Sequence, residues 1–301
     1  MLQRLGNAIL ASRFQAILVT SLLSMFGLLV PFFTYIGSGL VPGLVCLGRN
    51  TASGIQVVFG SFVLTTLFAI AANTDPYVVV AIAVGIWIPV WITANVLRIT
   101  ASQSSMLLAA AMVGMVYILL THILVNDIVA WWQGWLDLWL EQLSGHANRE
   151  KLAALFNMAA PFMNAMTVAG LFVSLVCTVF CARWWQAHLV NKGGFRKEFH
   201  ALRLPGLLVY PVIALVVFMI INDSKPGSMV VDILVLLIFV YLFQGIASIH
   251  RVVTDRKLSG MWLTGMYVFL FLLPQLLLFI ACIGMIDSWL YKQRAETDSE
   301  T

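Results

Sequence analysis

Four polar side chains lie within long apolar runs of the chain or directly at their ends, where each could take part in binding a ligand. Asp232 and Gln244 share one run, Gln275 lies in the last run, and Asp287 directly follows it. A polar group at membrane depth needs a partner, which either a ligand or a neighbouring helix can supply. We therefore expect ligand-binding residues among these four, with helix-to-helix hydrogen bonds and ordinary solvated helix ends as the alternatives.

Of the two amides, Gln275 is the better ligand candidate. It follows Pro274, which cannot donate a backbone hydrogen bond and so frees a carbonyl group in the preceding turn. At about 1.5 Å per residue, Gln244 and Gln275 differ in depth by roughly 12 Å. We expect each amide to have its own partner, with Gln244 contributing mainly to stability.

Carboxylates gather at the ends of the apolar runs that we assign to the outside. They are Asp75, Asp127, Asp223, Asp232 and Asp287. His122 lies one helical turn from Asn126 and Asp127, and a His–Asp pair could relay protons. A structural histidine is the more frequent role for such a residue.

Signatures of enzymes are absent from the sequence. There is no HExxH, GxSxG, P-loop or CxxC motif, so we expect neither catalysis nor a cofactor, and any ATPase would be a separate chain. Cys177 and Cys181 share a helix face, but no His or carboxylate accompanies them, so we expect packing and not a metal site.

Small residues recur at every fourth position near the N-terminus. They are Ala8, Ser12, Ala16, Thr20 and Ser24. Such a row lets another helix approach closely, and close packing holds helices together in lipid. The second helix could belong to this chain, which we favour, or to a partner membrane subunit.

The apolar runs predict an all-α fold, a polytopic bundle of about nine transmembrane helices. The 301 residues are 61% hydrophobic and 10% charged, whereas soluble domains are about a quarter charged. Each span needs about 20 apolar residues. Proline breaks allow eight to ten spans, and Pro274 could split the last run into a hairpin. The expected spans are 14–30, 32–47, 53–72, 77–97, 104–125, 160–184, 205–222, 229–249 and 261–286.

Basic residues divide unevenly between the two sides of this nine-span map. With the N-terminus in the cytoplasm, 12 of the 17 Lys and Arg residues fall inside. Cytoplasmic loops carry such an excess, so we expect a multi-pass protein of the bacterial inner membrane. The net charge of +4 then reflects these loops and lipid headgroups, and no nucleic acid partner is expected.

Two connections stand out within what we expect to be a single membrane domain, 1–301. Residues 127–143 are rich in Trp and predict an interfacial helix on the outer face. Residues 186–204 form a basic cytoplasmic loop, in which 195–204 predict a short amphipathic helix. Within that loop, Arg196, Lys197 and Arg203 are candidates for contact with a partner or with lipid.

Three short segments resemble the YybS-like family of uncharacterised bacterial membrane proteins. They are 193–205 (GGFRKEFHALRLP), 244–250 (QGIASIH) and 284–289 (GMIDSW). That family is distantly similar to the S components of energy-coupling factor transporters. The resemblance implies a helical protein that binds a small ligand from outside and docks, through small residues of an early helix, on a coupling membrane subunit with two ATPases. About nine spans, where S components have six, depart from that pattern.

Two functions remain open at this point. The first is a ligand-binding component of a transporter. The second is a membrane scaffold or assembly factor that presents the basic loop to a partner or to anionic lipid.

Overall fold

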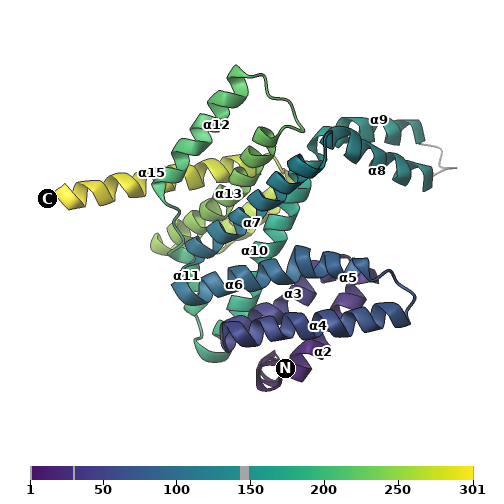
Figure 1. The fold of residues 1–301 in the computed structure, drawn as a ribbon. Coiled ribbons are helices and arrows are strands. Elements are labelled where there is room, and N and C mark those ends of the chain that lie inside the picture. Colours follow the sequence, from purple (N-terminus) through teal and green to yellow (C-terminus); the bar gives the residue numbers. More distant parts are fainter. Residues whose placement is uncertain (1, 30, 143–148, 301) are drawn as a thin grey trace. The chain divides into compact units, whose positions relative to one another are not determined.

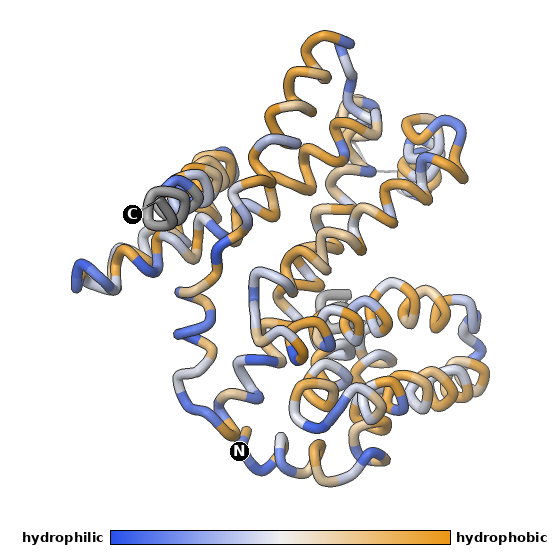
Figure 2. The backbone as a smooth tube through the Cα atoms, turned by 60° about the vertical axis from the view of Figure 1, so that its left-hand side comes forward, coloured by the Kyte–Doolittle hydropathy of each residue, from blue (hydrophilic) through white to orange (hydrophobic). Residues whose placement is uncertain are grey.

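The described part of the structure, a computed structural model, is helical throughout. It covers residues 2–29, 31–142 and 149–300, and none of these residues is in a strand. Hydrophobic residues run along most of the helices, and hydrophilic residues gather at the connections (Figure 2). Five helices are long and apolar enough to cross a membrane, or six if one bent pair is counted as a span. The predicted helical membrane bundle is confirmed.

The expected spans correspond closely to the observed helices. The five long helices are Thr51–Ala71, Tyr77–Thr100, Gln103–Leu124, Arg149–Val190 and Met229–Asp255. Shorter apolar helices account for other predicted spans, namely Ile36–Gly48, Gly206–Ile221, Met261–Leu272 and Leu276–Tyr291. The last predicted run, 261–286, is therefore two helices separated at Pro274, as the hairpin alternative allowed.

The chain forms two compact units. The first contains the residues up to Ala110 together with Val173–Leu202, and the second contains Ala111–Phe172 and the residues from Arg203 onward. The chain passes between them within α7 (Gln103–Leu124), within α10 (Met163–Val190) and after Leu202.

The first unit is built on helices that pack around α3 (Figure 1). Its other helices are α1 (Leu2–Ala11), α2 (Arg13–Leu29), α4 (Thr51–Ala71), α5 (Tyr77–Ile82), α6 (Ile88–Thr100) and α11 (Gly194–His200), and α3 itself is Pro31–Gly48. A π-helical turn, Ala83–Trp87, joins α5 to α6 just before Pro89. Proline has no N–H to donate, and a wider π-helical turn changes the local hydrogen-bond pattern beside it.

The second unit is organised around α13 (Met229–Asp255), which packs most extensively on α15 (Leu276–Glu300). Its remaining helices are α8 (Ile128–Gln142), α9 (Arg149–Ala159), α12 (Val209–Ile221) and α14 (Met261–Leu272), with 3-10 turns at Ala160–Phe162 and Gly206–Leu208. In α8, Trp131, Trp135 and Trp139 are all exposed, and residue 143 of the predicted Trp-rich helix lies outside the described residues.

Candidate functional site

A buried carboxylate, Asp232, forms the centre of one polar cluster in the second unit. Its Oδ2 atom lies 2.8 Å from Nε2 of His122 and 2.5 Å from Nδ2 of Asn164. Asp232 is 0% exposed and Asn164 is 1% exposed. We call His122, Asn164 and Asp232 the Asp232 cluster; its side chains come from α7, α10 and α13.

Helix ends position all three side chains. Asp232 lies in the first turn of α13, and its N–H donates to the carbonyl of Ser228 at 3.1 Å. Asn164 lies in the first turn of α10, and His122 lies in the last turn of α7. Three helix ends therefore meet at this point and bring the three side chains together.

The Asp232 cluster contains polar atoms without a hydrogen-bond partner among the described residues. They are Oδ1 of Asp232 and Oδ1 of Asn164, and the hydroxyl of Ser228 one turn before Asp232 is unpaired as well. A buried acceptor that lacks a donor costs about 1–3 kcal/mol, and more if it is charged. A donor or a cation reaching these two oxygens would remove that cost.

The sequence singled out Asp232 but paired His122 with the wrong neighbour. Asp127 instead accepts the backbone N–H of Ala130 at 2.9 Å at the start of α8. Asn164 was not singled out, although it stands at the start of an apolar run and the reasoning applied to Gln244 would have found it.

A second polar cluster joins α13 to α15. The Nε2 atom of Gln244 donates to Oδ2 of Asp287 at 3.1 Å, and Arg251 donates to both oxygens of Asp287 at 2.8 and 2.7 Å. The other end of the same amide, Gln244 Oε1, accepts the N–H of Leu204 at 3.0 Å, and Ser288 donates to the carbonyl of Leu204 at 3.0 Å. We call these five residues the Gln244 cluster.

Two glycines allow α13 and α15 to approach closely enough to form this cluster. A Cβ atom at Gly245 would lie 1.9 Å from the carbonyl oxygen of Ile280, and one at Gly284 would lie 2.2 Å from that of Tyr241. Any side chain at either position would collide with backbone. The crossing therefore fixes where Gln244 and Asp287 meet.

The Gln244 cluster brings together the three segments that resemble the YybS-like proteins. Leu204 comes from the first, Gln244 from the second, and Asp287 with Ser288 from the third. The nine-span map placed Asp287 outside and Arg251 inside, and their ion pair shows that this part of the map is wrong. The break at Pro274 explains the error, because an additional reversal of the chain returns α15 to the Arg251 end of α13.

Gln275 lies apart from both clusters. It is exposed in the turn between α14 and α15, and its side chain makes no hydrogen bond within the described part of the chain. Gln244 has its own partners, as expected, and does not bond to Gln275.

The row of small residues is split between two helices. The axes of α1 and α2 differ by 117°, with the break at Ser12, so Ala8 and Ser12 do not continue the face of α2. Ala16, Thr20 and Ser24 are fully buried. Ser24 and Thr65 of α4 lie 3.3 Å apart through their hydroxyl oxygens, so α4 of this chain packs on the row.

The basic loop forms a shorter helix than the sequence predicted. The helix α11 ends at His200, and an ion pair between Arg183 and Glu198 ties it to α10. Arg196 and Lys197 are exposed on α11. Arg203 instead stacks over the ring of Tyr291 in the second unit, with Cζ 4.3 Å from the ring centre.

Comparison with known proteins places the chain in a family. No curated protein and no solved structure shows significant similarity to it. A family model described as "Predicted membrane protein (DUF2232)" matches residues 18–288, which include every residue of both clusters. Since the match extends over most of the sequence and agrees with the YybS-like resemblance, the chain belongs to this predicted membrane protein family, DUF2232.

Proposed function

We propose that this protein is the ligand-binding component of a membrane transport system, and that its ligand binds at the Asp232 cluster. The observation that carries the proposal is the Asp232 carboxylate, which is fully buried and has one oxygen with no hydrogen-bond partner in the described part of the chain. A carboxylate at the centre of a membrane helix costs about 2.5–3.5 kcal/mol on insertion scales, and a buried acceptor that lacks a donor costs about 1–3 kcal/mol at a helix end as well. Such a residue is more often functional than structural in membrane proteins.

The chemistry of the cluster indicates the class of ligand. The unpaired atoms of Asp232 and Asn164 are both acceptors, so they are complementary to a cation or to a hydrogen-bond donor such as an ammonium group. His122 already donates to, or shares a proton with, the other carboxylate oxygen. We therefore propose a small ligand that carries a positive charge or an N–H donor.

Mass spectrometry of the natively purified protein tests this proposal. The experiment compares small molecules that are released from the wild type, from Asp232→Asn and from the control Asp75→Asn, in which an exposed carboxylate changes. We expect the wild type and Asp75→Asn to release the same compound and Asp232→Asn to release little of it. Equal release from all three proteins would refute the Asp232 site.

The proposed orientation has the N-terminus in the cytoplasm of a bacterial cell. It rests on the excess of basic residues in the connections assigned to the inside. Lys197→Cys, in a background that lacks the four native cysteines, tests it through labelling with an impermeant maleimide. We expect labelling only after the membrane is permeabilised, and labelling in intact cells would reverse the orientation.

For transport driven by ATP, another protein would supply the ATPase, because this sequence contains no P-loop. We propose a coupling membrane subunit with separate ATPases, on the analogy with S components. Co-purification with such a subunit would support this, although the buried row on α2 is not free to receive it.

A scaffold or assembly role is the second candidate. It is favoured by Arg196 and Lys197, which are exposed on α11 while the Arg183–Glu198 pair holds that helix in place. If the protein is a scaffold, a partner protein should co-purify with the wild type and with Asp232→Asn. The partner should be lost from the double variant Arg196→Ala/Lys197→Ala.

A further inference from the structure

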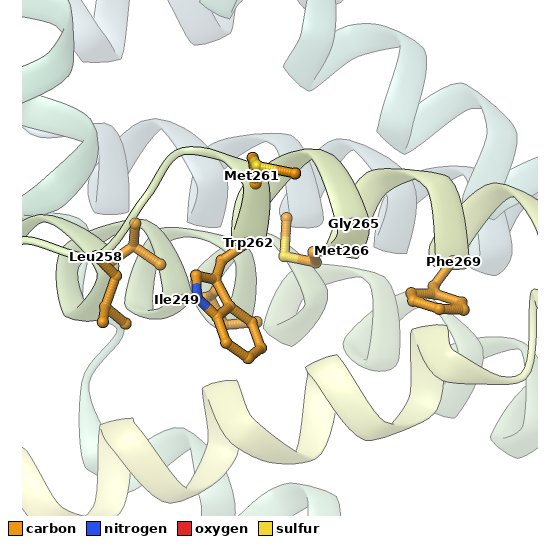
Figure 3. Close-up of a pocket in the computed structure, with 8 residues that line it drawn as sticks. Ile249, Leu258, Met261, Trp262, Gly265, Met266 and Phe269 are labelled. Atoms are coloured by element: carbon orange, nitrogen blue, oxygen red, sulfur yellow. The ribbon is translucent and has the colours of Figure 1, made fainter.

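An apolar pocket of about 430 Å³ lies between the C-terminal half of α13 and helix α14. All of its lining residues are apolar, and they include Ile249 and Val253 on α13. Trp262, Met266 and Phe269 point to the same side of α14 (Figure 3), as their spacing of four and three residues requires. Its volume lies within the roughly 300–1,000 Å³ that is typical of ligand pockets.

The turn after α13 closes one end of the pocket. Lys257 has φ of 53°, and the N–H of Leu258 donates to the carbonyl of Val253 at 2.9 Å. This Schellman arrangement folds the chain back on the last turn of the helix and brings Leu258 against it. Leu258 and Val253 both line the pocket as a result.

Basic residues adjoin that same end. Arg256 and Lys257 immediately precede Leu258 and are both exposed, and they outnumber the one neighbouring carboxylate, Asp255. A hydrogen bond of 2.8 Å between His250 and Tyr267 adds polar groups between α13 and α14. The pocket is thus apolar along its length and positively charged at one end.

We propose that this pocket binds one acyl chain of an anionic phospholipid, with the headgroup paired to Arg256 and Lys257. An apolar tail matches the lining, and an anionic headgroup matches the adjoining charges. The exposed indole of Trp262 fits the depth at which acyl chains meet headgroups. This site involves no residue of the Asp232 cluster and is independent of the proposed transport function.

Gly265 offers a direct way to block the pocket. It lines the pocket, and a Cβ atom at this position would meet no other atom within 4 Å. The side chain of Gly265→Leu therefore starts in open space and is expected to extend into the volume that the acyl chain needs. Gly134→Leu is the matched control, because Gly134 also faces open space but lies on α8.

Native mass spectrometry with defined lipids tests the proposal. The purified full-length protein is delipidated and mixed with equal amounts of dioleoyl phosphatidylglycerol and dioleoyl phosphatidylcholine. We expect the wild type and Gly134→Leu to retain one phosphatidylglycerol, with roughly tenfold preference over phosphatidylcholine. Gly265→Leu should lose this bound lipid, whereas Arg256→Gln/Lys257→Gln should lose the preference for phosphatidylglycerol and still bind an acyl chain.

Two results would overturn the proposal. One is equal retention of phosphatidylglycerol by the wild type and Gly265→Leu, which would place the lipid elsewhere. The other is equal retention of both lipids by the wild type, which would indicate an unspecific lipid shell. Thermal unfolding of each variant shows whether it is folded, and the double glutamine variant, which leaves the pocket lining intact, provides the test if Gly265→Leu is not.

Discussion

The Asp232 and Gln244 clusters both place a carboxylate within the helices of one unit, but they differ in how fully it is paired. Asp287 uses both oxygens and meets a cation and an amide. Asp232 uses one oxygen for both of its partners, and its other oxygen has no partner among the residues that the structure describes. A fully paired network rigidifies a fold, whereas an incomplete one is costly unless something else completes it. The difference supports a structural role for the Gln244 cluster and the binding role that we propose for the Asp232 cluster.

The largest effect is expected from Gly245→Val, which would separate the two helices that form the Gln244 cluster. A Cβ atom would lie 1.9 Å from the carbonyl of Ile280, so α13 and α15 must separate. We expect no folded protein to be recovered, as judged by size-exclusion chromatography in detergent. The control Gly170→Ala, on α10, meets no atom within 4 Å and should be recovered at the wild-type level. Normal recovery of Gly245→Val would mean that the crossing is not close.

Asp287→Asn should have the next largest effect, a loss of about 2–3 kcal/mol in the free energy of unfolding. The change leaves the charge of Arg251 without its counter-charge in a largely buried place. Denaturant titration in detergent measures the loss. The double variant Arg251→Gln/Asp287→Asn should lose clearly less than the sum of its single variants, and simple additivity would show that the two residues do not interact.

Gln244→Leu should cost about 1–2 kcal/mol, because the buried N–H of Leu204 loses its acceptor. Gln275→Leu is the matched control, since its amide is exposed and should change stability by less than about 0.5 kcal/mol. Both proteins should keep the ligand. Loss of ligand from Gln275→Leu alone would instead restore Gln275 as a binding residue.

Asp232→Asn should have the smallest effect on stability, within about 1 kcal/mol of the wild type. An asparagine oxygen in the position of Oδ2 can still accept from His122 and Asn164, and a neutral NH2 group replaces the unpaired charged oxygen. The same Asp→Asn substitution is therefore expected to lower the free energy of unfolding at position 287 and to leave it nearly unchanged at position 232. Equal destabilisation at both positions would remove the distinction between the clusters.

The sequence predicted the helices better than the contacts between them. Spans such as 53–72 and 104–125 match Thr51–Ala71 and Gln103–Leu124 closely, because hydropathy over about 20 residues is a local property. The partner of His122 is 110 residues away in the sequence, and no local spacing indicates it.

The position of Asp287 shows where counting of spans fails. One proline in a 26-residue apolar run decides whether α15 ends on one side or the other, and hydropathy does not distinguish the two. Each of the three YybS-like segments contributes to the Gln244 cluster, although their resemblance gave no reason for them to meet. The reason lies in the structure, where Gly245 and Gly284 allow α13 and α15 to approach closely.

The two bonds that hold Leu204 impose an order on the biosynthesis of this protein. Its N–H is bound by Gln244, 40 residues later in the chain, and its carbonyl by Ser288, 84 residues later. Since a ribosome adds roughly 5–20 residues each second, α12 and α13 must wait in the membrane for several seconds before α15 arrives. During that interval the carbonyl of Leu204, Nε2 of Gln244 and the guanidinium of Arg251 still lack their partners on α15. These polar groups are therefore paired within the described helices only when α15 has packed on α13.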